Sequence, residues 1–364
     1  MPDFSVFHGK RVVVTGHTGF KGSWLSLWLN ELGAEVFGIS VDVPTHPSHF
    51  ESLDLGSFVR DYRLDIVDAQ SLRSLLEELK PDFVFHLAAQ ALVRQSYENP
   101  VETWRTNTVG TLNVLDALRE CSHHCVAVLI TSDKSYDNVE WVWGYRENDA
   151  VGGIDPYSAS KGAAELAIRS YVRSYFSADS DVRIGVARAG NVIGGGDWAV
   201  DRIVPDCVKA WAKGETVLLR NPPATRPWQH VLEPLGGYLT LATNLNIRHE
   251  LHGEAFNFGP LAQQNHSVLD LVTQMSRYWE QVRWNDDSAG YCGPHESGLL
   301  KLNCDKALHL LNWHATWGFE ETVRATTLWY RNFYAHDQKN IREFSCRQIE
   351  AYTRSAREIG LEWA

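Results

Sequence analysis

The sequence predicts an α/β protein in which a doubly wound parallel sheet is followed by a smaller, mixed α/β C-terminal region. Three observations favour this fold. Strand-like and helix-like segments alternate through the first half of the 364-residue chain, which is the pattern of repeated β-α-β units. The strand-like segments are short, continuously apolar and rich in β-branched residues, as expected when helices cover both faces of a sheet. A glycine-rich turn separates the first strand from the first helix.

That turn is the most informative local feature. Residues 15–22 read Thr-Gly-His-Thr-Gly-Phe-Lys-Gly, directly after an apolar strand-like run and before an apolar run of helical length. Glycine allows a tight turn and the close approach of a pyrophosphate, and a helix N-terminus offers free N–H groups and a positive dipole end. The spacing G-x-x-G-x-x-G in this context therefore predicts a dinucleotide site on a Rossmann-type sheet.

The other elements follow in order along the chain. Strands are predicted over residues 11–15, 35–40, 59–62, 83–86, 126–131 and 183–188, and helices over residues 21–32, 71–79, 101–120 and 158–176. The third of these helices has Pro100 just inside its start, where a missing N–H is tolerated.

The character of the chain changes after about residue 190. Loop-rich segments at residues 194–198 and 221–227 alternate with helices and short strands, and no clean linker separates them from the first half. We expect residues 1–190 to form the dinucleotide-binding domain with the catalytic residues. Residues 191–364 are expected to be mainly the substrate-binding region, packed over the C-terminal edge of the sheet, with an approximate boundary and possible interleaving.

Composition limits the range of functions. The formal net charge is -11 without a basic block, which argues against a nucleic-acid surface. No apolar run reaches membrane-spanning length, and the first five residues do not resemble a signal peptide, so we expect a cytoplasmic protein with reduced cysteines. Cys121 and Cys125 flank two histidines, but ligands this close in one short loop would struggle to close a tetrahedron, so no metal is expected.

Tyr157 and Lys161 form the first candidate catalytic pair. Their i, i+4 spacing on a predicted helix puts both side chains on one face. A nearby ammonium favours phenolate and lowers the pKa of the tyrosine, so that it can act as a general base on a hydroxyl. The spacing alone is common, but it comes one unit after Ser132, Asp133 and Lys134, which lie at the C-terminal end of a buried strand, where open α/β sheets place their ligands.

Together these motifs resemble the extended short-chain dehydrogenase/reductase family, which acts on nucleotide sugars. The resemblance covers nearly the whole chain and rests on residues 15–22, Asp65 and Ile66, residues 86–90, Asn107, residues 131–134, Tyr157 with Lys161, and residues 188–192. Within the family, segments 16–24, 131–134 and 226–234 most closely resemble the dehydratase branch that acts on CDP-glucose, a precursor of deoxysugars in lipopolysaccharide O-antigens.

The resemblance implies a set of catalytic roles. Ser132 would hydrogen-bond the substrate 4-hydroxyl, and Tyr157 would remove its proton while a hydride leaves C4 for NAD. Asp133 would be the acid toward the C6 hydroxyl. Many relatives have Glu as the base at C5, where this chain has Lys134, which must be neutral to act. The hydride would finally return to C6.

The cofactor is expected to be NAD. The usual acidic residue for the ribose hydroxyl would fall near Ser40, and Asp42, two residues later, could serve instead. No arginine cluster follows to accept the 2′-phosphate of NADP. His17 and Lys21 are expected either to touch the pyrophosphate or to be solvated. By motif and resemblance the cofactor-binding residues are Gly16, His17, Thr18, Gly19, Phe20, Lys21, Gly22, Asp42, Asp65, Ile66, Leu87, Ala88, Ala89, Gln90, Asn107, Tyr157 and Lys161.

The substrate is expected to lie against residues from both halves of the chain. Arginine forks suit a pyrophosphate, and the loop at residue 221 could reach the pyrimidine. The candidates are Arg94, Ser96, Asn191, Arg202, Arg220, Asn221 and Arg226, whereas His86 is interpreted as a hydrogen-bonded core histidine. The resemblance also implies a homodimer or homotetramer formed through a four-helix bundle of the helices at 101–120 and 158–176.

Two alternatives stay open at this stage. A related nucleotide-sugar epimerase, or a dehydratase with another base, would share most of these motifs, but a simple 4-epimerase needs neither an acid at C6 nor a base at C5. A non-catalytic NAD-binding regulator would have no need for Tyr157 and Lys161.

Overall fold

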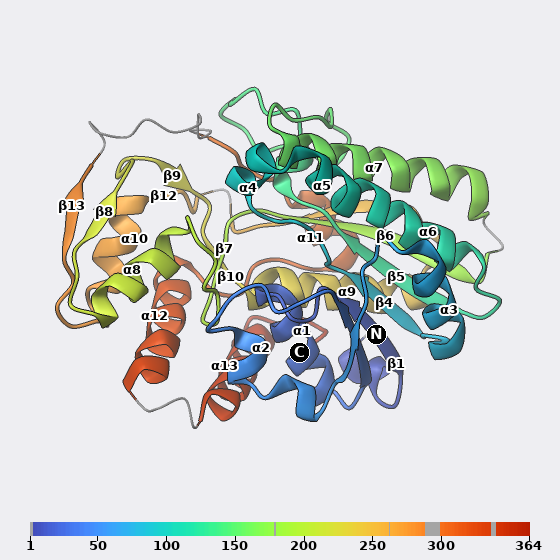
Figure 1. The fold of residues 1–364 in the computed structure, drawn as a ribbon, viewed down its shortest axis with the longest axis horizontal. Coiled ribbons are helices and arrows are strands. Elements are labelled where there is room, and N and C mark those ends of the chain that lie inside the picture. The colour runs from blue at the N-terminus through green and yellow to red at the C-terminus, as the bar shows by residue number, and fades with distance from the viewer. Residues whose placement is uncertain (1–2, 178–179, 262, 288–298, 336–339) are drawn as a thin grey trace.

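A seven-stranded parallel sheet forms the centre of the molecule (Figure 1). The computed structural model describes residues 3–177, 180–261, 263–287, 299–335 and 340–364, and within them the strand order is β11-β6-β5-β4-β1-β2-β3. All six pairings between neighbouring strands of this described sheet are parallel, which confirms the predicted fold class. The strands are β1 (Arg11–Thr15), β2 (Glu35–Ser40), β3 (Arg60–Arg63), β4 (Phe83–His86), β5 (Cys125–Ile130), β6 (Val182–Ala189) and β11 (Ala255–Phe258).

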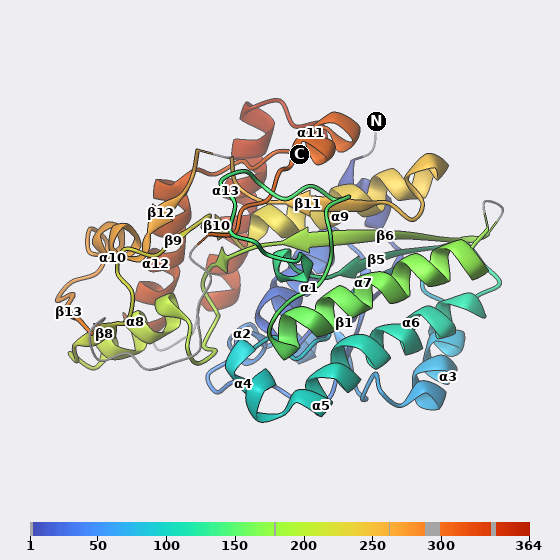
Figure 2. The ribbon, with the colours of Figure 1, turned by 90° about the horizontal axis from the view of Figure 1, so that it is seen from above.

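Helices cover both faces of this sheet (Figure 2). One face carries α3 (Ala69–Leu79), α6 (Gly110–Arg119) and α7 (Pro156–Tyr175), and the other carries α1 (Phe20–Glu31) and α9 (Leu232–Ile247). Successive side chains of a strand point to opposite faces, so Val12 and Val14 enter the core under α1 and α9, while Val13 enters the core under α3, α6 and α7. This two-sided burial explains why the strands read as continuous apolar runs.

The helix predicted over residues 101–120 is interrupted. It consists of α5 (Pro100–Trp104), a π-helical segment (Arg105–Val109) and α6. The helix is therefore present to within one residue of its predicted bounds, and its middle turn is π-helical. The wide turn contains the buried Asn107, whose side chain bonds the loop after β4, and a π-turn of this kind often marks a functional site.

Much of the C-terminal region lies beyond the carboxyl ends of the strands, on the left of Figure 1, whereas α9 covers a face of the sheet. In the described residues it contains three two-stranded pairs, and one sheet strand, β11, also comes from beyond residue 190. Besides α9 and β11, its elements are β7 (Val192–Ile193), α8 (Ile203–Ala212), β8 (Val217–Leu219), β9 (Thr225–Arg226), β10 (Gln229–His230), β12 (His266–Ser267), α10 (Val268–Met275), β13 (Trp284–Asp286), α11 (Asp305–Leu311), α12 (Phe319–Ala335) and α13 (Ile341–Glu358). The first half also contains two short helices, α2 (His49–Ser52) and α4 (Val93–Glu98).

The last helix returns to the first one. Tyr352 of α13 packs edge-on against Trp28 of α1, with ring centroids 5.7 Å apart. Trp363 stacks on Phe4 at 4.8 Å, so the two ends of the described chain meet over α1. Among the described helices, none combines the length and the apolar composition that a membrane crossing requires.

Candidate active site

The glycine turn between β1 and α1 has the geometry of a phosphate cradle. Gly16 has a φ of +76°, and a Cβ there would lie 2.8 Å from the backbone nitrogen of Ala88. A Cβ on Gly22 would lie 2.0 Å from the carbonyl oxygen of Gly16. Gly19 is the N-cap of α1 and supplies no side chain to bond the first-turn N–H groups, so a ligand phosphate can accept from them.

His17 points away from this cradle and into the sheet. Its ring is fully buried beside Gly38, with Nδ1 3.0 Å from the Ser40 hydroxyl and Nε2 3.1 Å from Asp61 Oδ1. Burial, opposed by Asp61, lowers the pKa of His17 to about 4. The expectation of a solvated side chain is therefore wrong for His17, because the ring packs over Gly38 of β2 and reaches Asp61 of β3.

The adenosine end of the expected site lies at the carboxyl ends of β2 and β3. The Thr18 hydroxyl donates to the Asp42 carbonyl at 2.6 Å, which leaves the exposed Asp42 carboxylate beside the turn. Asp65 accepts a bond from the Val67 N–H, and Ile66 is buried against Gly110. These positions suit contacts to a ribose and to an adenine face, respectively.

The loop after β4 is fastened by Asn107. Its amide accepts from the Gln90 N–H at 2.9 Å and donates to the Gln90 carbonyl at 3.0 Å and to the Ser160 hydroxyl at 2.9 Å. This loop, residues 87–90, passes close to the backbone of Gly16. His86, just before it, bonds Thr15 and Thr111 through its two ring nitrogens, which confirms the interpretation as a hydrogen-bonded core residue.

Three polar residues follow the end of β5, as the sequence predicts. The Ser132 hydroxyl donates to Asp133 Oδ1 at 3.0 Å and accepts from the Lys134 N–H at 3.2 Å. Asp133 is buried, and this burial raises the pKa of its carboxyl above its usual range, against the opposing charge of Lys134. A raised pKa favours the protonated form that a general acid needs. A Cβ on Gly190 would lie 2.8 Å from the Asp133 carboxylate, so glycine makes room for it.

Tyr157 and Lys161 occupy the first two turns of α7 and face this loop. Ser132 hydrogen-bonds the Tyr157 phenol, and Lys161 Nζ lies 3.4 Å from the Ile130 carbonyl. Burial raises the pKa of Tyr157 and lowers the pKa of Lys161 to about 8. The prediction that the Tyr157 pKa lies below its usual value is wrong for the protein alone, because desolvation of the phenol outweighs the stabilising effects of Ser132 and Arg202.

Lys21 lies closer to the catalytic end than the sequence suggests. Burial and the nearby charge of Arg202 lower its pKa to about 8, while Asp133 opposes the shift. Arg202 is fixed by an ion pair with Asp197 at 2.7 Å. Lys21 therefore lies near Asp133, and Arg202 lies near both Lys21 and Tyr157.

The other substrate candidates are distributed along the C-terminal edge of the sheet. Arg94 and Arg220 both pair with Asp201, at 3.1 and 2.8 Å, although they come from opposite halves of the chain. Asn191 follows β6 and its carbonyl accepts from Gln229, while Arg226 lies in β9 and donates to the Thr225 carbonyl at 2.8 Å.

The remaining two candidates differ in their exposure. Ser96 is fully buried, and its hydroxyl donates to the Val93 carbonyl and accepts from the Tyr157 N–H, so it faces α7 rather than an open pocket. Asn221 is exposed at a turn.

Asp201, Glu165 and the role of Arg188 were not predicted from the sequence. Asp201 has a left-handed φ of 61° and joins two of the proposed substrate arginines. Glu165 lies one helical turn after Lys161, and this spacing was a usable signal. Within the described ranges, no group of three or more histidine, cysteine or acidic side chains could hold a metal ion.

Comparisons with known proteins agree with this geometry. The family model described as GDP-mannose 4,6 dehydratase matches residues 13–326. The chain is 47% identical over 336 residues to the CDP-glucose 4,6-dehydratase of Salmonella typhimurium, covering 91% of this chain and 93% of that protein.

Two solved structures share the fold. An epimerase from Methanothermobacter thermautotrophicus superposes with a TM-score of 0.76 at 23% identity and covers 93% of this chain and 96% of its own. The dTDP-glucose 4,6-dehydratase of Streptomyces venezuelae, solved with NAD bound, gives a TM-score of 0.73 at 22% identity and covers 90% and 100%, respectively. At these identities the likeness establishes the fold.

Proposed function

The chain belongs to the family described as GDP-mannose 4,6 dehydratase, and we propose that within it the protein is an NAD-dependent hydro-lyase that converts CDP-D-glucose to CDP-4-keto-6-deoxy-D-glucose. The observation that carries the substrate assignment is the high identity to a CDP-glucose 4,6-dehydratase along almost the full length of both chains. The cluster of Ser132, Asp133, Lys134 and Tyr157 supports the reaction type.

The glycine cradle supports the choice of a dinucleotide. A Cβ on Gly16 or Gly22 would collide with the backbone of Ala88 or of Gly16, so glycine permits the tight turn, and the first turn of α1 has no side-chain cap on its N–H groups beside it. We assign the pyrophosphate to this turn, the ribose to Asp42, the adenine to Asp65 and Ile66, and the nicotinamide side to the loop at residues 87–90. NAD, when bound, supplies a hydride acceptor for C4 and later a hydride donor for C6.

The first step is oxidation at C4. Ser132 bonds the substrate 4-hydroxyl, and Tyr157 takes the hydroxyl proton as the C4 hydride departs. Arg202 and the Ser132 bond both oppose the rise in the pKa of Tyr157 that burial causes, so these two groups help the phenol to act as a base. Lys161 holds the ribose of the cofactor and adds positive charge to the same pocket.

The second step is elimination of water across C5 and C6. The new 4-ketone acidifies the C5 hydrogen, Lys134 removes it as a proton, and the C6–O bond breaks as Asp133 protonates the leaving hydroxyl. The resulting C5=C6 double bond would then accept the hydride at C6 and, at C5, the proton held by Lys134. The 4-hydroxyl proton stays on Tyr157 and Asp133 has given one up, so a proton returns from Tyr157 to Asp133, directly or through solvent, before the next turnover. The raised pKa of Asp133 supports its role as the proton donor.

The nucleotide end of the substrate is assigned to the arginines at the C-terminal edge. Arg202 and Arg226 present planar guanidinium groups that suit a pyrophosphate, with Asn191 beside them. Arg94 and Arg220 both form ion pairs with Asp201, so residues from both halves of the chain lie together here. We assign Asn221 and the loop around it to contacts with the pyrimidine.

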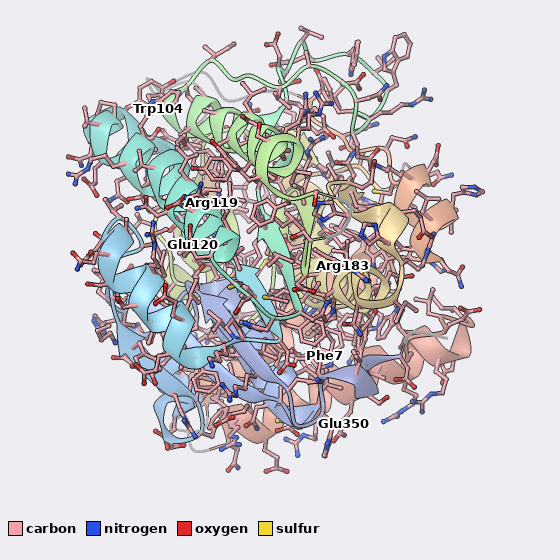
Figure 3. All side chains as sticks on the ribbon, turned by 90° about the vertical axis from the view of Figure 1, so that its right-hand side faces the viewer. Phe7, Trp104, Arg119, Glu120, Arg183 and Glu350 are labelled. Atoms are coloured by element: carbon pink, nitrogen blue, oxygen red, sulfur yellow. The ribbon has the colours of Figure 1, made fainter. Side chains whose placement is uncertain are left out.

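We further propose that two copies pair through α5, α6 and α7. α5 and α6 run end to end, from the end at Trp104 to the end at Arg119 in Figure 3, and α7 lies beside them. They carry large apolar side chains with high exposed fractions, namely Val101 (72%), Trp104 (40%), Leu166 (53%) and Tyr175 (53%). Large exposed apolar side chains on these neighbouring helices support a subunit contact.

A product assay by mass spectrometry tests the proposal. The protein is incubated with NAD and, in separate reactions, CDP-glucose, dTDP-glucose, UDP-glucose and GDP-mannose. We expect loss of one water from CDP-glucose alone, and with deuterium at C4 the label should move to C6. A change in sugar configuration without water loss would favour an epimerase, and no change in any of the four would contradict catalysis on nucleotide sugars.

A further inference from the structure

A buried carboxylate lies next to the catalytic pair without belonging to it. Glu165 follows Tyr157 and Lys161 at the same four-residue spacing, so all three side chains lie on one face of α7. Its exposed fraction is 3%, which is unusual for a glutamate unless it is paired. None of the chemical steps proposed for the reaction uses this group.

Arg188, near the end of β6, clamps Glu165 with two bonds. Its Nε lies 2.7 Å from Oε1 and its Nη2 lies 2.9 Å from Oε2, in a fork that fixes the plane of the carboxylate. The Arg188 side chain is itself buried, and its Nη1 donates to the Tyr136 hydroxyl at 2.6 Å. Tyr136 donates in turn to Asn257 of β11 at 2.8 Å, so the clamp is anchored in the sheet.

The fixed carboxylate has one further partner, and this partner adjoins the active site. The Thr131 hydroxyl donates to Glu165 Oε1 at 2.5 Å, and Thr131 directly precedes Ser132. One turn earlier on the same helix, Lys161 Nζ lies 3.4 Å from the carbonyl of Ile130. Two successive residues of the chain leaving β5 are therefore attached to two successive turns of α7.

We propose that Glu165 is a positioning residue that, clamped by Arg188, holds Thr131 and thereby keeps Ser132 in register with Tyr157 for the oxidation of C4. This inference rests on the function proposed above. The loop with Ser132 leaves β5 and the base Tyr157 lies on α7, so their relative position depends on contacts between these two elements. Small errors in such a position are costly, because proton and hydride transfer require near-attack geometry.

The role requires a carboxylate rather than an amide. Glu165 accepts three bonds on two oxygens, whereas glutamine offers one acceptor oxygen and would turn its NH2 group toward a donor. The amide would also leave Arg188 as a buried charge without its counter-ion, which destabilises the fold strongly. The negative charge of Glu165 also opposes the fall in the Lys161 pKa and so supports the charged state of that neighbour.

Variants at Thr131 test the proposal without removing the ion pair. Thr131→Val deletes the hydroxyl at nearly constant shape, while Thr131→Ser keeps the hydroxyl and removes only a methyl group. We expect Thr131→Val to lower kcat by roughly 10- to 100-fold with the KM for CDP-glucose nearly unchanged, and Thr131→Ser to keep most of the kcat. Single-turnover formation of reduced nicotinamide should show the same loss, because it reports C4 oxidation directly.

Hydrogen exchange tests the positioning itself, independently of turnover. In the full-length protein, amides in the segment 131–136 should exchange faster in Thr131→Val and in Glu165→Gln than in the parent. Glu233→Gln is the matched control, since Glu233 is another buried, triply bonded glutamate, and its bonds go to Thr316, Trp317 and Tyr352. That variant should lower the melting temperature and leave exchange in segment 131–136 unchanged.

The outcomes separate this inference from the proposed function. Unchanged exchange in Thr131→Val, an unchanged kcat, or equal losses in the Val and Ser variants would overturn the positioning role. If the parent removes no water from any nucleotide sugar, the proposed function fails, and the exchange measurements still decide whether Glu165 fixes this loop.

Discussion

Tyr157 and Lys161 lie four residues apart on α7. Burial raises the pKa of Tyr157 and lowers the pKa of Lys161, and both shifts favour the neutral form of the side chain. The spacing of the pair is written in the sequence, whereas the sign of the shift on Tyr157 depends on how deeply α7 packs against the end of β5. Asp133 responds to the same burial, and for a proton donor this direction is the useful one. Burial at the end of β5 thus favours the neutral form of all three side chains.

The Lys134 position offers a sharp test of the two-step mechanism. Lys134→Met removes the proposed C5 base and leaves Ser132 and Tyr157 in place for C4 oxidation. We expect reduced nicotinamide to form and persist, with water loss slowed by at least about 100-fold, the range in which general bases contribute. Stopped-flow absorbance follows the first step, and mass spectrometry of quenched samples follows the second.

Tyr157→Phe is the matched control for this variant. It should prevent both formation of reduced nicotinamide and water loss, because it removes the base for the first step. Normal water loss in Lys134→Met would show that another group takes the C5 proton.

At the scale of elements, each strand and helix predicted in the first half agrees with the structure to within two residues, whereas the short helices α2 and α4 were not predicted. Local periodicity and the glycine turn were sufficient there, because each strand is buried on both faces and each helix begins next to a recognisable boundary. The π-helical segment Arg105–Val109 could not be predicted, since it accommodates contacts of Asn107 with a loop and a helix that lie elsewhere in the sequence.

The glycine turn predicts a selective effect of a single methyl group. In Gly22→Ala the new Cβ would lie 2.0 Å from the Gly16 carbonyl, so the turn must open. We expect a loss of about 1–3 kcal/mol in the free energy of unfolding, as for other overpacked sites, together with weaker NAD binding. Calorimetric titration with NAD and thermal denaturation measure the two effects.

Gly56→Ala serves as the comparison for that variant. Its Cβ would meet its nearest neighbour, Phe50, at 3.7 Å, an ordinary contact distance. It should bind NAD as the parent does, and an equal loss of NAD binding in both variants would contradict the role of the turn.

At the scale of the molecule, the apolar side chains on α5 and α7 predict association. Leu166→Glu places a charge on the proposed contact surface, where its desolvation on pairing would be unfavourable. We expect sedimentation velocity to show a shift from dimer or tetramer toward monomer. Leu308→Glu, at an exposed leucine of α11, should leave the oligomer intact, and a parent that sediments as a monomer would contradict the proposal.

Glu233 predicts a pH-dependent contribution to stability. Burial raises its pKa to about 7 from the usual 4.5, although the Thr316 and Trp317 N–H groups oppose the shift. Between these two pH values the folded state holds a proton that the unfolded chain has released, so the contribution of Glu233 falls as pH rises through this window. The free energy of unfolding of the parent, relative to that of Glu233→Gln, should fall by about 3 kcal/mol between pH 4.5 and pH 8.

Denaturant unfolding of both proteins across this pH range gives the difference in their free energies of unfolding. The contribution of the buried histidines cancels in this difference, because both proteins contain them. Glu358→Gln, at an exposed position near the end of α13, should give a flat difference from the parent. A flat difference for Glu233→Gln as well would show that the carboxyl titrates normally in the folded state.

The sequence by itself determined the parallel sheet, the cofactor turn, and the placement of Ser132, Asp133, Lys134, Tyr157 and Lys161, because each depends on spacing within one strand, turn or helix. Tertiary structure decided the rest. It buries His17 against Asp61, brings Lys21 toward Asp133, and joins Glu165 to Arg188 across 23 residues of chain. The physical reason is that desolvation and contacts between distant residues arise only when the elements pack, and these effects set the charge and position of groups whose identity the sequence already contains.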